Sequence, residues 1–455
     1  MKITKTIRLL ENPRQWLQDD FLRRLFKNAA VLFSGNMVSS LLGLISLSLT
    51  ARALGVENFG VLVLITTYVL IVDNLINFQS WQTIIKYGAD ALEETRDQDF
   101  KSLVKFGFML DGATAVLGTI IGASAAWFVG NWWGWDEQHV LMAAIYSIVI
   151  LFHIQGTPTG LLRLFDRFNK VAYQSVIASS IKLIGVSIAF FAGAGLWAFL
   201  LVWAVVDILG KLILVYFACQ ELEQHKFHGI LKSKIGGVSQ KFSGLWGFAL
   251  TTNINSSIRM ASKQLDIMII AAMLSPAAVG LYTIAKQFSL VIQKTIDPLY
   301  QSIFPEMARL YAKGEVKDFV RFGFRSSLLA GLFALGVWFF FYFFGKMAIG
   351  LIVGDDYLGA ASVMLWYMMA IVVAAVSFPL QPAMLSMGRP QTTLWVHLVA
   401  TVIYFTALFA LLPYIGLTGA GVSYLIYYIA WSLLMLAIEF FLISKRVTPN
   451  AAPAD

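Results

Sequence analysis

Two hydrophobic runs separated by a short polar turn occupy residues 29–80, AAVLFSGNMVSSLLGLISLSLTARALGVENFGVLVLITTYVLIVDNLINFQS. Each run is about twenty residues long, which lets a helix cross roughly 30 Å of hydrocarbon. Similar runs recur along the whole chain, and 58% of its 455 residues are hydrophobic while 13% are charged. Soluble proteins do not have this composition. We therefore predict an all-α integral membrane protein, which excludes sheet-rich and nucleic-acid-binding classes.

Twelve such runs are predicted to span the membrane. They are residues 29–51, 59–80, 106–130, 139–157, 171–193, 196–218, 244–272, 277–304, 323–345, 357–386, 391–413 and 417–443. Most of the 34 lysines and arginines lie in alternate connections, whereas the intervening connections hold only Arg52 and Lys346. Because cytoplasmic loops carry the excess of positive charge, both termini are predicted to be cytoplasmic.

The two halves of the chain carry matching landmarks about 220 residues apart. The matched pairs are Gly60 with Gly280, Pro158 with Pro379, Arg167 with Arg389, and Gly195 with Gly416. Since six predicted spans separate the copies, the halves form two parallel, pseudo-symmetric repeats of six helices. Alternating-access transporters are commonly built from such repeats, with the substrate path between them. We therefore predict a transporter.

The predicted organisation follows from this duplication. An N-terminal segment at residues 1–27 is rich in Lys and Arg and either lies on the inner membrane surface or is a solvated tail. A six-helix bundle at 28–218, a cytoplasmic linker at 219–243, a second six-helix bundle at 244–443 and a cytoplasmic tail at 444–455 complete the chain.

Several short segments resemble one known family of membrane exporters. They are RALGVENFG at residues 52–60, DIMII at 266–270, VGLY at 279–282 and FPEMA at 304–308. These segments are similar to the polysaccharide-flippase branch of the multidrug/oligosaccharidyl-lipid/polysaccharide (MOP) exporter superfamily. In that branch two six-helix bundles enclose a central cavity, and Wzx-type members move polyprenyl-pyrophosphate-linked oligosaccharides from the inner to the outer leaflet.

The resemblance implies a function in surface polysaccharide biosynthesis, such as that of O-antigen, capsule or exopolysaccharide. It implies the bacterial inner membrane as the location, with both membrane lipids and a lipid-linked oligosaccharide as partners. A polysaccharide polymerase and a chain-length protein would be further partners, and no nucleic acid is expected.

Six cations fall inside the predicted spans: Lys182, Lys211, Arg259, Lys263, Lys286 and Lys294. Exposing each to lipid would cost about 2.5–3.5 kcal/mol, so all should face protein or water. Three have an acid within reach on their own helix, in the pairs Asp207 with Lys211, Lys263 with Asp266, and Lys294 with Asp297.

The remaining cations have no acid near them in sequence. A phosphate-bearing lipid head group needs cationic partners, for which Arg and Lys are suited. We therefore predict Arg259, Lys286 and Lys182 as substrate-binding residues. Lys263 shares a polar helix face with Arg259 and is a fourth candidate. The alternative is that pairs between helices neutralise these charges.

Intramembrane carboxylates are the usual carriers of a coupling ion. Asp73 and Asp297 are predicted to carry H⁺ or Na⁺, and the alternative is an ion pair with a cation on another helix. His153 and His397 stand alone in their spans, and we predict packing or hydrogen-bonding roles for both.

The sequence also limits the chemistry. It contains no G-x-x-x-x-G-K-[ST] phosphate loop, and Cys219 is its single cysteine. ATP is therefore not expected to be the direct energy source, and no cysteine-based metal site can form within the chain. Every predicted outer connection is short, whereas membrane enzymes of glycan synthesis usually need a sizeable external loop. We therefore predict no catalytic residue, no metal site and no cofactor other than the coupling ion, and the protein is not expected to be an enzyme. Two competing functions stay open: a cation-coupled multidrug exporter of the same superfamily, and an integral-membrane glycan polymerase or ligase.

Overall fold

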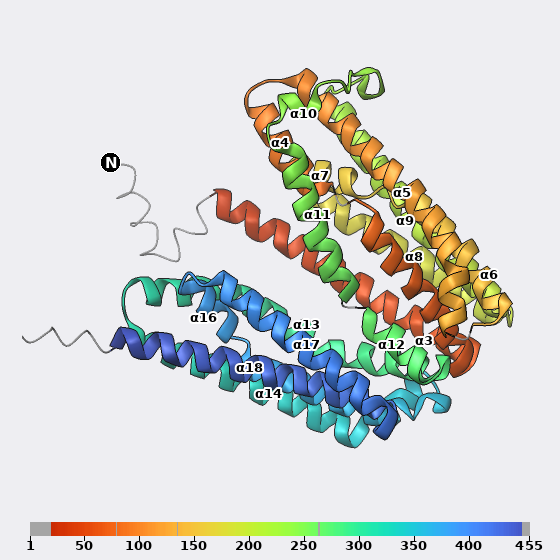
Figure 1. Cartoon of the computed structure of the whole chain (residues 1–455), viewed down its shortest axis with the longest axis vertical. Helices are drawn as coiled ribbons and strands as arrows, with labels where there is room; N and C mark the ends of the chain where they lie inside the picture. Colours follow the sequence, from red (N-terminus) through yellow and green to blue (C-terminus); the bar gives the residue numbers. More distant parts are fainter. Residues whose placement is uncertain (1–19, 79, 134, 263, 448–455) are drawn as a thin grey trace, which may run out of the picture. The chain divides into compact units, whose positions relative to one another are not determined.

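The computed structural model describes the backbone of residues 20–447 apart from residues 79, 134 and 263. Within that range it describes the side chains of all residues except 20–33, 131–133, 255–262, 291, 294–302 and 444–447. All regular elements in the described part of the chain are helices (Figure 1). The predicted all-α fold is thus confirmed.

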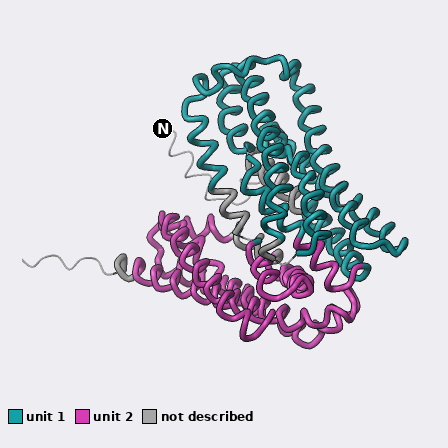
Figure 2. The backbone as a smooth tube through the Cα atoms, turned by 45° about the vertical axis from the view of Figure 1, so that its right-hand side comes forward, with its two compact units in different colours: residues 1–53, 65–264 teal, residues 54–64, 265–455 magenta. Residues whose placement is uncertain are grey.

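The chain divides into two compact units (Figure 2). Unit 1 contains residues 1–53 and 65–264, and unit 2 contains residues 54–64 and 265–455. Helix α3 (Asp20–Ile76) belongs to unit 1 except for residues 54–64. The other helices of unit 1 are α4 (Trp81–Glu93), α5 (Asp97–Trp133), α6 (Glu137–Tyr146), α7 (Gly156–Leu164), α8 (Phe168–Phe191), α9 (Leu196–Gln224), α10 (Val238–Lys241) and α11 (Leu245–Ser262), with short 3₁₀ turns η1 (Ser147–Phe152) and η2 (Ile230–Lys232). The predicted bundle boundaries at 28–218 and 244–443 stay a prediction.

Unit 2 is built from α12 (Leu265–Met273), α13 (Pro276–Ala312), α14 (Val316–Ile352), the 3₁₀ turn η3 (Asp355–Tyr357), α15 (Ala360–Ser377), α16 (Leu380–Ser386), α17 (Pro390–Ile415) and α18 (Thr418–Val447). Within it α15 packs against both α14 and α18, and α17 packs against α18 (Figure 1).

Within the described residues, nine helical stretches are long and apolar enough to cross a membrane. One of them, Ser34–Glu93, covers most of the first predicted span and all of the second, which are joined at Gly55. Gly55 has φ 71° and ψ 173°, a conformation that interrupts the helix and favours glycine. The number of crossings, predicted to be twelve, stays a prediction.

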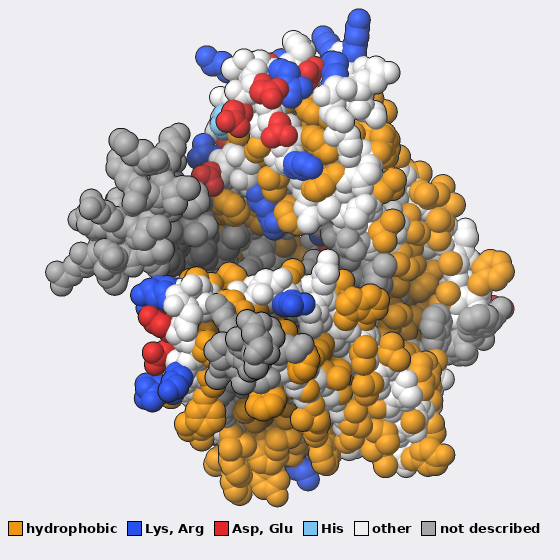
Figure 3. Space-filling model, turned by 60° about the vertical axis from the view of Figure 1, so that its left-hand side comes forward, with side chains coloured by type: hydrophobic (Ala, Val, Ile, Leu, Met, Phe, Trp, Pro, Cys, Tyr) orange, Lys and Arg blue, Asp and Glu red, His pale blue; other side chains and the backbone are white. Residues whose placement is uncertain are grey.

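The outer surface of the helices suits a lipid environment. Large apolar side chains are exposed on several helices, including Phe191 at 84%, Phe343 at 71% and Phe440 at 77% exposed. Figure 3 shows hydrophobic side chains over much of the visible surface, with Lys, Arg, Asp and Glu gathered at the top of the view and in a smaller group at its lower left. Since a water-soluble protein rarely exposes so large an apolar surface, this distribution indicates a membrane protein.

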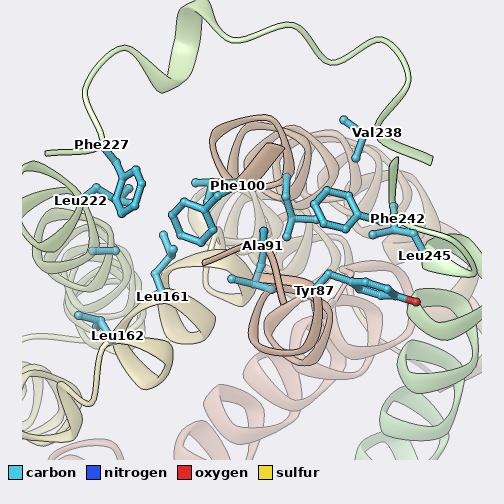
Figure 4. Close-up of a cluster of buried hydrophobic side chains, with 14 of the residues drawn as sticks. Tyr87, Ala91, Phe100, Leu161, Leu162, Leu222, Phe227, Val238, Phe242 and Leu245 are labelled. Atoms are coloured by element: carbon cyan, nitrogen blue, oxygen red, sulfur yellow. The ribbon is translucent and has the colours of Figure 1, made fainter. Parts of the chain in front are cut away.

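Unit 1 has a hydrophobic core of its own. Tyr87 of α4, Phe100 of α5, Leu161 of α7 and Leu222 of α9 contribute to one buried cluster (Figure 4). The segment after α9 joins the same cluster through Phe227, Val238 and Phe242. The predicted linker at 219–243 is therefore packed onto unit 1 by its apolar side chains.

The two halves of the chain repeat each other in detail. Asp166, after α7, has φ 59°, and Gly388, after α16, has φ 73°. In both turns the next residue donates its N–H to the carbonyl five residues earlier, at 2.7 Å for Arg167 and 3.1 Å for Arg389. A second matched pair of turns contains Thr95 and Gly314. The helices that follow these turns, α5 and α14, both contain 37 residues. The matching landmarks in the sequence thus mark matching backbone conformations.

Candidate functional site

Two interrupted helices bring polar groups together inside unit 1. Helix α3 ends at Ile76 and α4 begins at Trp81, while η1 and α7 are separated by residues 153–155. The two interruptions touch: a Cβ on Gly156 would lie 2.6 Å from Ser80 Oγ, so only glycine fits there. Interrupted helices at membrane depth occur where the backbone is covered by protein or lines a cavity, and transporters use them as ion sites.

A histidine between two carboxylates occupies the centre of this region. His153 follows η1, and its Nδ1 lies 2.9 Å from Asp73 Oδ2 of α3. Its Nε2 lies 3.2 Å from Asp207 Oδ2 of α9. His153 and Asp73 are almost completely buried, while the Asp207 side chain is 41% exposed. The three side chains form an Asp73–His153–Asp207 triad that spans three helical elements.

Neighbouring amide and hydroxyl groups hold the triad in place. Asn77 Nδ2 donates to Asp73 Oδ1 at 3.0 Å and to the His153 carbonyl oxygen at 2.8 Å. Thr114 Oγ1 of α5 donates to Asn77 Oδ1 at 3.2 Å and accepts from the Phe78 N–H at 3.0 Å. This network satisfies the Phe78 N–H, which follows α3, and the His153 carbonyl oxygen, which follows η1.

A third carboxylate lies beside the interruption. Asp111 of α5 is fully buried, and its Oδ2 accepts the N–H of Thr157 at the start of α7 at 2.7 Å. Ser80 Oγ and Thr157 Oγ1 are 3.0 Å apart in the same place. Among the described residues, the other Asp111 oxygen, Oδ1, has no hydrogen-bond partner.

Two lysines lie near the triad, one on the same helix as Asp207 and one on α8. Lys211, one turn beyond Asp207 on α9, donates to Gln155 Oε1 at 2.5 Å. Among the described residues Lys211 makes no direct ion pair with Asp207: Asp207 contacts His153 Nε2, and Lys211 acts on it through its charge alone. Lys182 of α8 places its ammonium 3.3 Å from the centre of the Trp203 ring, a cation–π contact.

The triad suits a proton-binding site. A neutral imidazole has one N–H donor and one lone pair, whereas imidazolium donates from both nitrogens. His153 Nε2 hydrogen-bonds Asp207, while Nδ1 lies within ion-pair distance of Asp73 without hydrogen-bond geometry; a carboxylate beside each nitrogen favours the ring with the extra proton. Removing that proton would leave a lone pair against a carboxylate inside the protein, which is unfavourable.

The second polar group lies in unit 2 and contains one of the predicted residues. Lys286 of α13 lies 2.9 Å from Asp266 Oδ2 of α12, and Tyr282 Oη donates to the same oxygen at 2.6 Å. Asp266 and Tyr282 are buried, and Lys286 is partly exposed. Tyr367 and Tyr424 extend this group, with their rings stacked at 4.1 Å.

The predicted residues therefore have different surroundings. Lys286 has an acid partner on another helix, which the search along its own helix missed because it could not detect contacts between helices. Asp73 pairs with His153, in agreement with the alternative of a partner on another helix. Lys182 makes a cation–π contact with the Trp203 ring. Arg259, Lys263 and Asp297 lie outside the residues whose side chains the structure describes. Together with Lys286, Lys182 and Asp73, they stay predictions as substrate or coupling residues.

His153 and Asp207 were not predicted as site residues. His153 appeared alone in its span, and Asp207 was assigned to Lys211. One feature of the sequence could have indicated them. Asp73, His153 and Asp207 all lie inside predicted membrane spans, where ionisable groups require partners. The sequence does not say which spans are neighbours, so it could not join these three residues.

Comparison with known proteins places the chain in a family. Residues 25–311 match the family model described as polysaccharide biosynthesis protein. The chain is 33% identical over 352 residues to the inner membrane protein YghQ of Escherichia coli (strain K12), covering 77% of this chain and 98% of that protein.

Two solved structures show the same fold. An inward-facing multidrug resistance MATE family transporter of the MOP superfamily has a TM-score of 0.72 at 15% identity, covering 93% of this chain and 100% of that chain. The lipid II flippase MurJ, in an inward closed conformation, has a TM-score of 0.66 at 14% identity, covering 91% of this chain and 90% of that chain.

These findings define the class of protein as a multi-pass, all-α membrane protein with the MOP transporter fold, as the sequence predicts. The chain belongs to the polysaccharide biosynthesis protein family of flippase-like membrane proteins. The two solved structures named above are of a transporter and a flippase.

Proposed function

We propose that this protein moves a polyprenyl-pyrophosphate-linked oligosaccharide from the inner to the outer leaflet of a bacterial inner membrane by alternating access. The product would supply O-antigen, capsule or exopolysaccharide synthesis, with a polymerase and a chain-length protein acting on the outer side. The family match over residues 25–311 carries this proposal. The shared fold with a lipid II flippase and the similarity to an inner membrane protein support it.

The anionic head group needs cations along its path. We propose Lys182, Lys286, Arg259 and Lys263 for this role. Lys182 is the best described candidate because its ammonium contacts a ring and makes no ion pair within the described residues. Lys286 is compensated by Asp266, so it can bind phosphate only by sharing or exchanging that carboxylate.

Deleting the gene tests the proposed function directly. Polyprenyl-linked oligosaccharide should accumulate facing the cytoplasm, and the wild-type chain should restore its movement. Normal appearance of surface glycan in the deletion strain, with no accumulation, would contradict the proposal.

The fold similarity to a multidrug resistance transporter favours a second candidate, a cation-coupled drug exporter. In that case the deletion strain should become sensitive to cationic dyes while its surface glycan stays normal.

We also propose that transport is coupled to protons through the Asp73–His153–Asp207 triad. The groups around His153 are Asp73 and Asn77 from α3, Asp111 and Thr114 from α5, Tyr146 from α6, Lys182 from α8, and Asp207 and Lys211 from α9. Within this group His153 is the side chain held between two acids, so its proton is the one that a conformational change can release.

Transport in energised vesicles tests the coupling. His153→Gln should abolish the dependence of transport on the proton gradient, whereas His139→Gln, at the start of α6, should keep it. Replacing Na⁺ by choline should change nothing in the wild type. Loss of transport on removing Na⁺, with unchanged proton dependence in His153→Gln, would show instead that Na⁺ is the coupling ion.

A further inference from the structure

A pocket of about 170 Å³ lies inside unit 2, apart from the Lys286–Asp266 pair. Four helical elements contribute polar side chains to its wall: Gln293 of α13, Gln381 of α16, His397 of α17, and Tyr427 with Trp431 of α18. The volume is suited to a ligand of one or two rings and too small for a whole oligosaccharide.

The amides in this wall are unsatisfied. Within the described residues, neither Gln293 nor Gln381 has a hydrogen-bond partner, although both are partly buried. Trp431 is 5% exposed, and its Nε1 also has no partner in that part of the chain. Polar groups inside a membrane bundle are costly unless water or a ligand satisfies them. The wall therefore provides hydrogen-bonding groups for something that enters it.

The rings in the wall are fixed in place. His397 Nδ1 lies 3.0 Å from Tyr427 Oη, and the His397 and Trp431 rings are 5.4 Å apart and tilted by 33°. Among the described residues His397 Nε2 has no partner, so it stays available to a ligand. The pocket thus combines flat aromatic faces with carboxamide and imidazole groups.

This combination discriminates among ligand classes. No Asp, Glu, Lys or Arg appears among the described residues of the wall, which argues against a cationic drug or a phosphate as the occupant. A lipid tail would leave both carboxamides without partners. A pyranose ring matches both features, because its C–H face packs on aromatic rings and its hydroxyls pair with carboxamides.

The position of the pocket fits a path for a polar ligand. Gln293 is seven residues after Lys286 on α13, nearly two helical turns, so both lie on one face about 10 Å apart. Ser289 lies between them on the same face. Ser289 is fully buried and donates to the Ala285 carbonyl oxygen, so Lys286 and Gln293 are the residues of this face that can contact a ligand.

We propose that this pocket, with Gln293, Gln381, His397 and Trp431, is a subsite that binds one neutral sugar ring of the transported glycan. The inference rests on the proposed function, since it assigns a place for part of that substrate. Gln293 and Gln381 bind the hydroxyls, while Trp431 and the Tyr427–His397 pair provide the surface on which the ring packs.

Saturation-transfer NMR tests the subsite on the full chain in lipid nanodiscs prepared without sugar-based detergent. The probes are N-acetylglucosamine, N-acetylgalactosamine, glucose, galactose and rhamnose. At least one should receive magnetisation from the protein, and Gln381→Ala and His397→Ala should each weaken that signal at least fivefold. Gln391→Ala, an exposed carboxamide at the start of α17, is the matched control and should leave the signal unchanged.

Thermal unfolding of each variant separates loss of sugar binding from loss of fold. If Gln381→Ala unfolds at a different temperature, His397→Gln provides a second variant that keeps a polar side chain. Absence of signal from all five sugars, or equal signals in Gln381→Ala and Gln391→Ala, would overturn the subsite. Failure of the proposed function is a separate result, because it would appear as wild-type protein that does not move lipid-linked oligosaccharide in the deletion strain.

Discussion

Lys286 shows how a charge becomes tolerable inside the membrane. Its ammonium contacts Asp266, whose carboxylate also accepts a hydrogen bond from Tyr282. Removing one partner of such a pair leaves an uncompensated buried charge, whereas removing both at once does not. A variant of one residue is therefore expected to be less stable than a variant that changes both residues of the pair.

Asp266→Asn should lower the free energy of unfolding by about 2–3 kcal/mol, because it removes the buried carboxylate that both Lys286 and Tyr282 contact. The charge-exchanged double variant Asp266→Lys with Lys286→Asp should recover part of that loss. Thermal unfolding of purified protein in nanodiscs measures both. Equal melting temperatures for the wild type and Asp266→Asn would show that the pair does not stabilise the fold.

At this scale the sequence predicts which residues need partners but not which partners they find. Six in-span cations were identified from hydropathy, and their burial or pairing was expected. Pairs along one helix follow from spacing, but Asp207 contacts His153, which is 54 residues away, and Lys286 contacts Asp266, which is on another helix. Contacts between helices depend on packing that a single sequence does not specify.

At the scale of helices, the close approach of α3 to the start of α13 depends on Gly60 and Gly280, two glycines at matching positions of the repeat. A Cβ on Gly60 would collide with the carbonyl oxygen of Pro276, and a Cβ on Gly280 would lie 2.5 Å from that of Val56. All four residues belong to unit 2. The two helix starts pack backbone against backbone, which small residues allow in membrane proteins.

Gly60→Ala should therefore destabilise the protein by about 1–3 kcal/mol, although alanine is the better helix former. Gly43→Ala is the matched control, since Gly43 lies on the same helix α3 with open space around its Cβ position. It should be neutral or slightly stabilising. Melting temperatures that fall equally in both variants would contradict the close approach at Gly60.

The second matched pair of turns differs in one residue. Thr95, between α4 and α5, has φ 55°, and Gly314, between α13 and α14, has φ 75°. A β-branched residue is strained at positive φ, while glycine is not. Thr95→Gly should raise the melting temperature, by an amount equivalent to about 1 kcal/mol. Gly314→Thr should lower the melting temperature. A lower melting temperature for Thr95→Gly, or a higher one for Gly314→Thr, would show that the turn is not strained.

The sequence predicts the helices more completely than their interruptions. Each predicted span falls on one or more of the observed helices, because long apolar runs leave few alternatives. The break at residues 77–80 was not predicted, since Asn77 and Ser80 fit the end of a hydrophobic run. The break depends on Thr114 and His153, which reach it from other parts of the chain.

For the whole molecule, the duplication and the alternation of charge make a joint prediction about orientation. Two parallel repeats of six helices enter the membrane from the same side, and the excess of Lys and Arg assigns that side to the cytoplasm. The matching turns at Asp166 and Gly388 support the repeat. The turns do not indicate the direction of insertion, which is predicted from the distribution of Lys and Arg.

The single cysteine makes this orientation measurable. In a Cys219→Ser background, Glu137→Cys and Lys317→Cys each introduce one exposed thiol, in a predicted outer and a predicted inner connection respectively. A membrane-impermeant maleimide should label the Glu137→Cys protein in spheroplasts and the Lys317→Cys protein only after permeabilisation. The reverse pattern would place both termini outside, and labelling of both sites in intact spheroplasts would show an even number of spans between them. Because residues 137–317 are predicted to contain five full spans, the outcome also tests the count on which the two-repeat architecture depends.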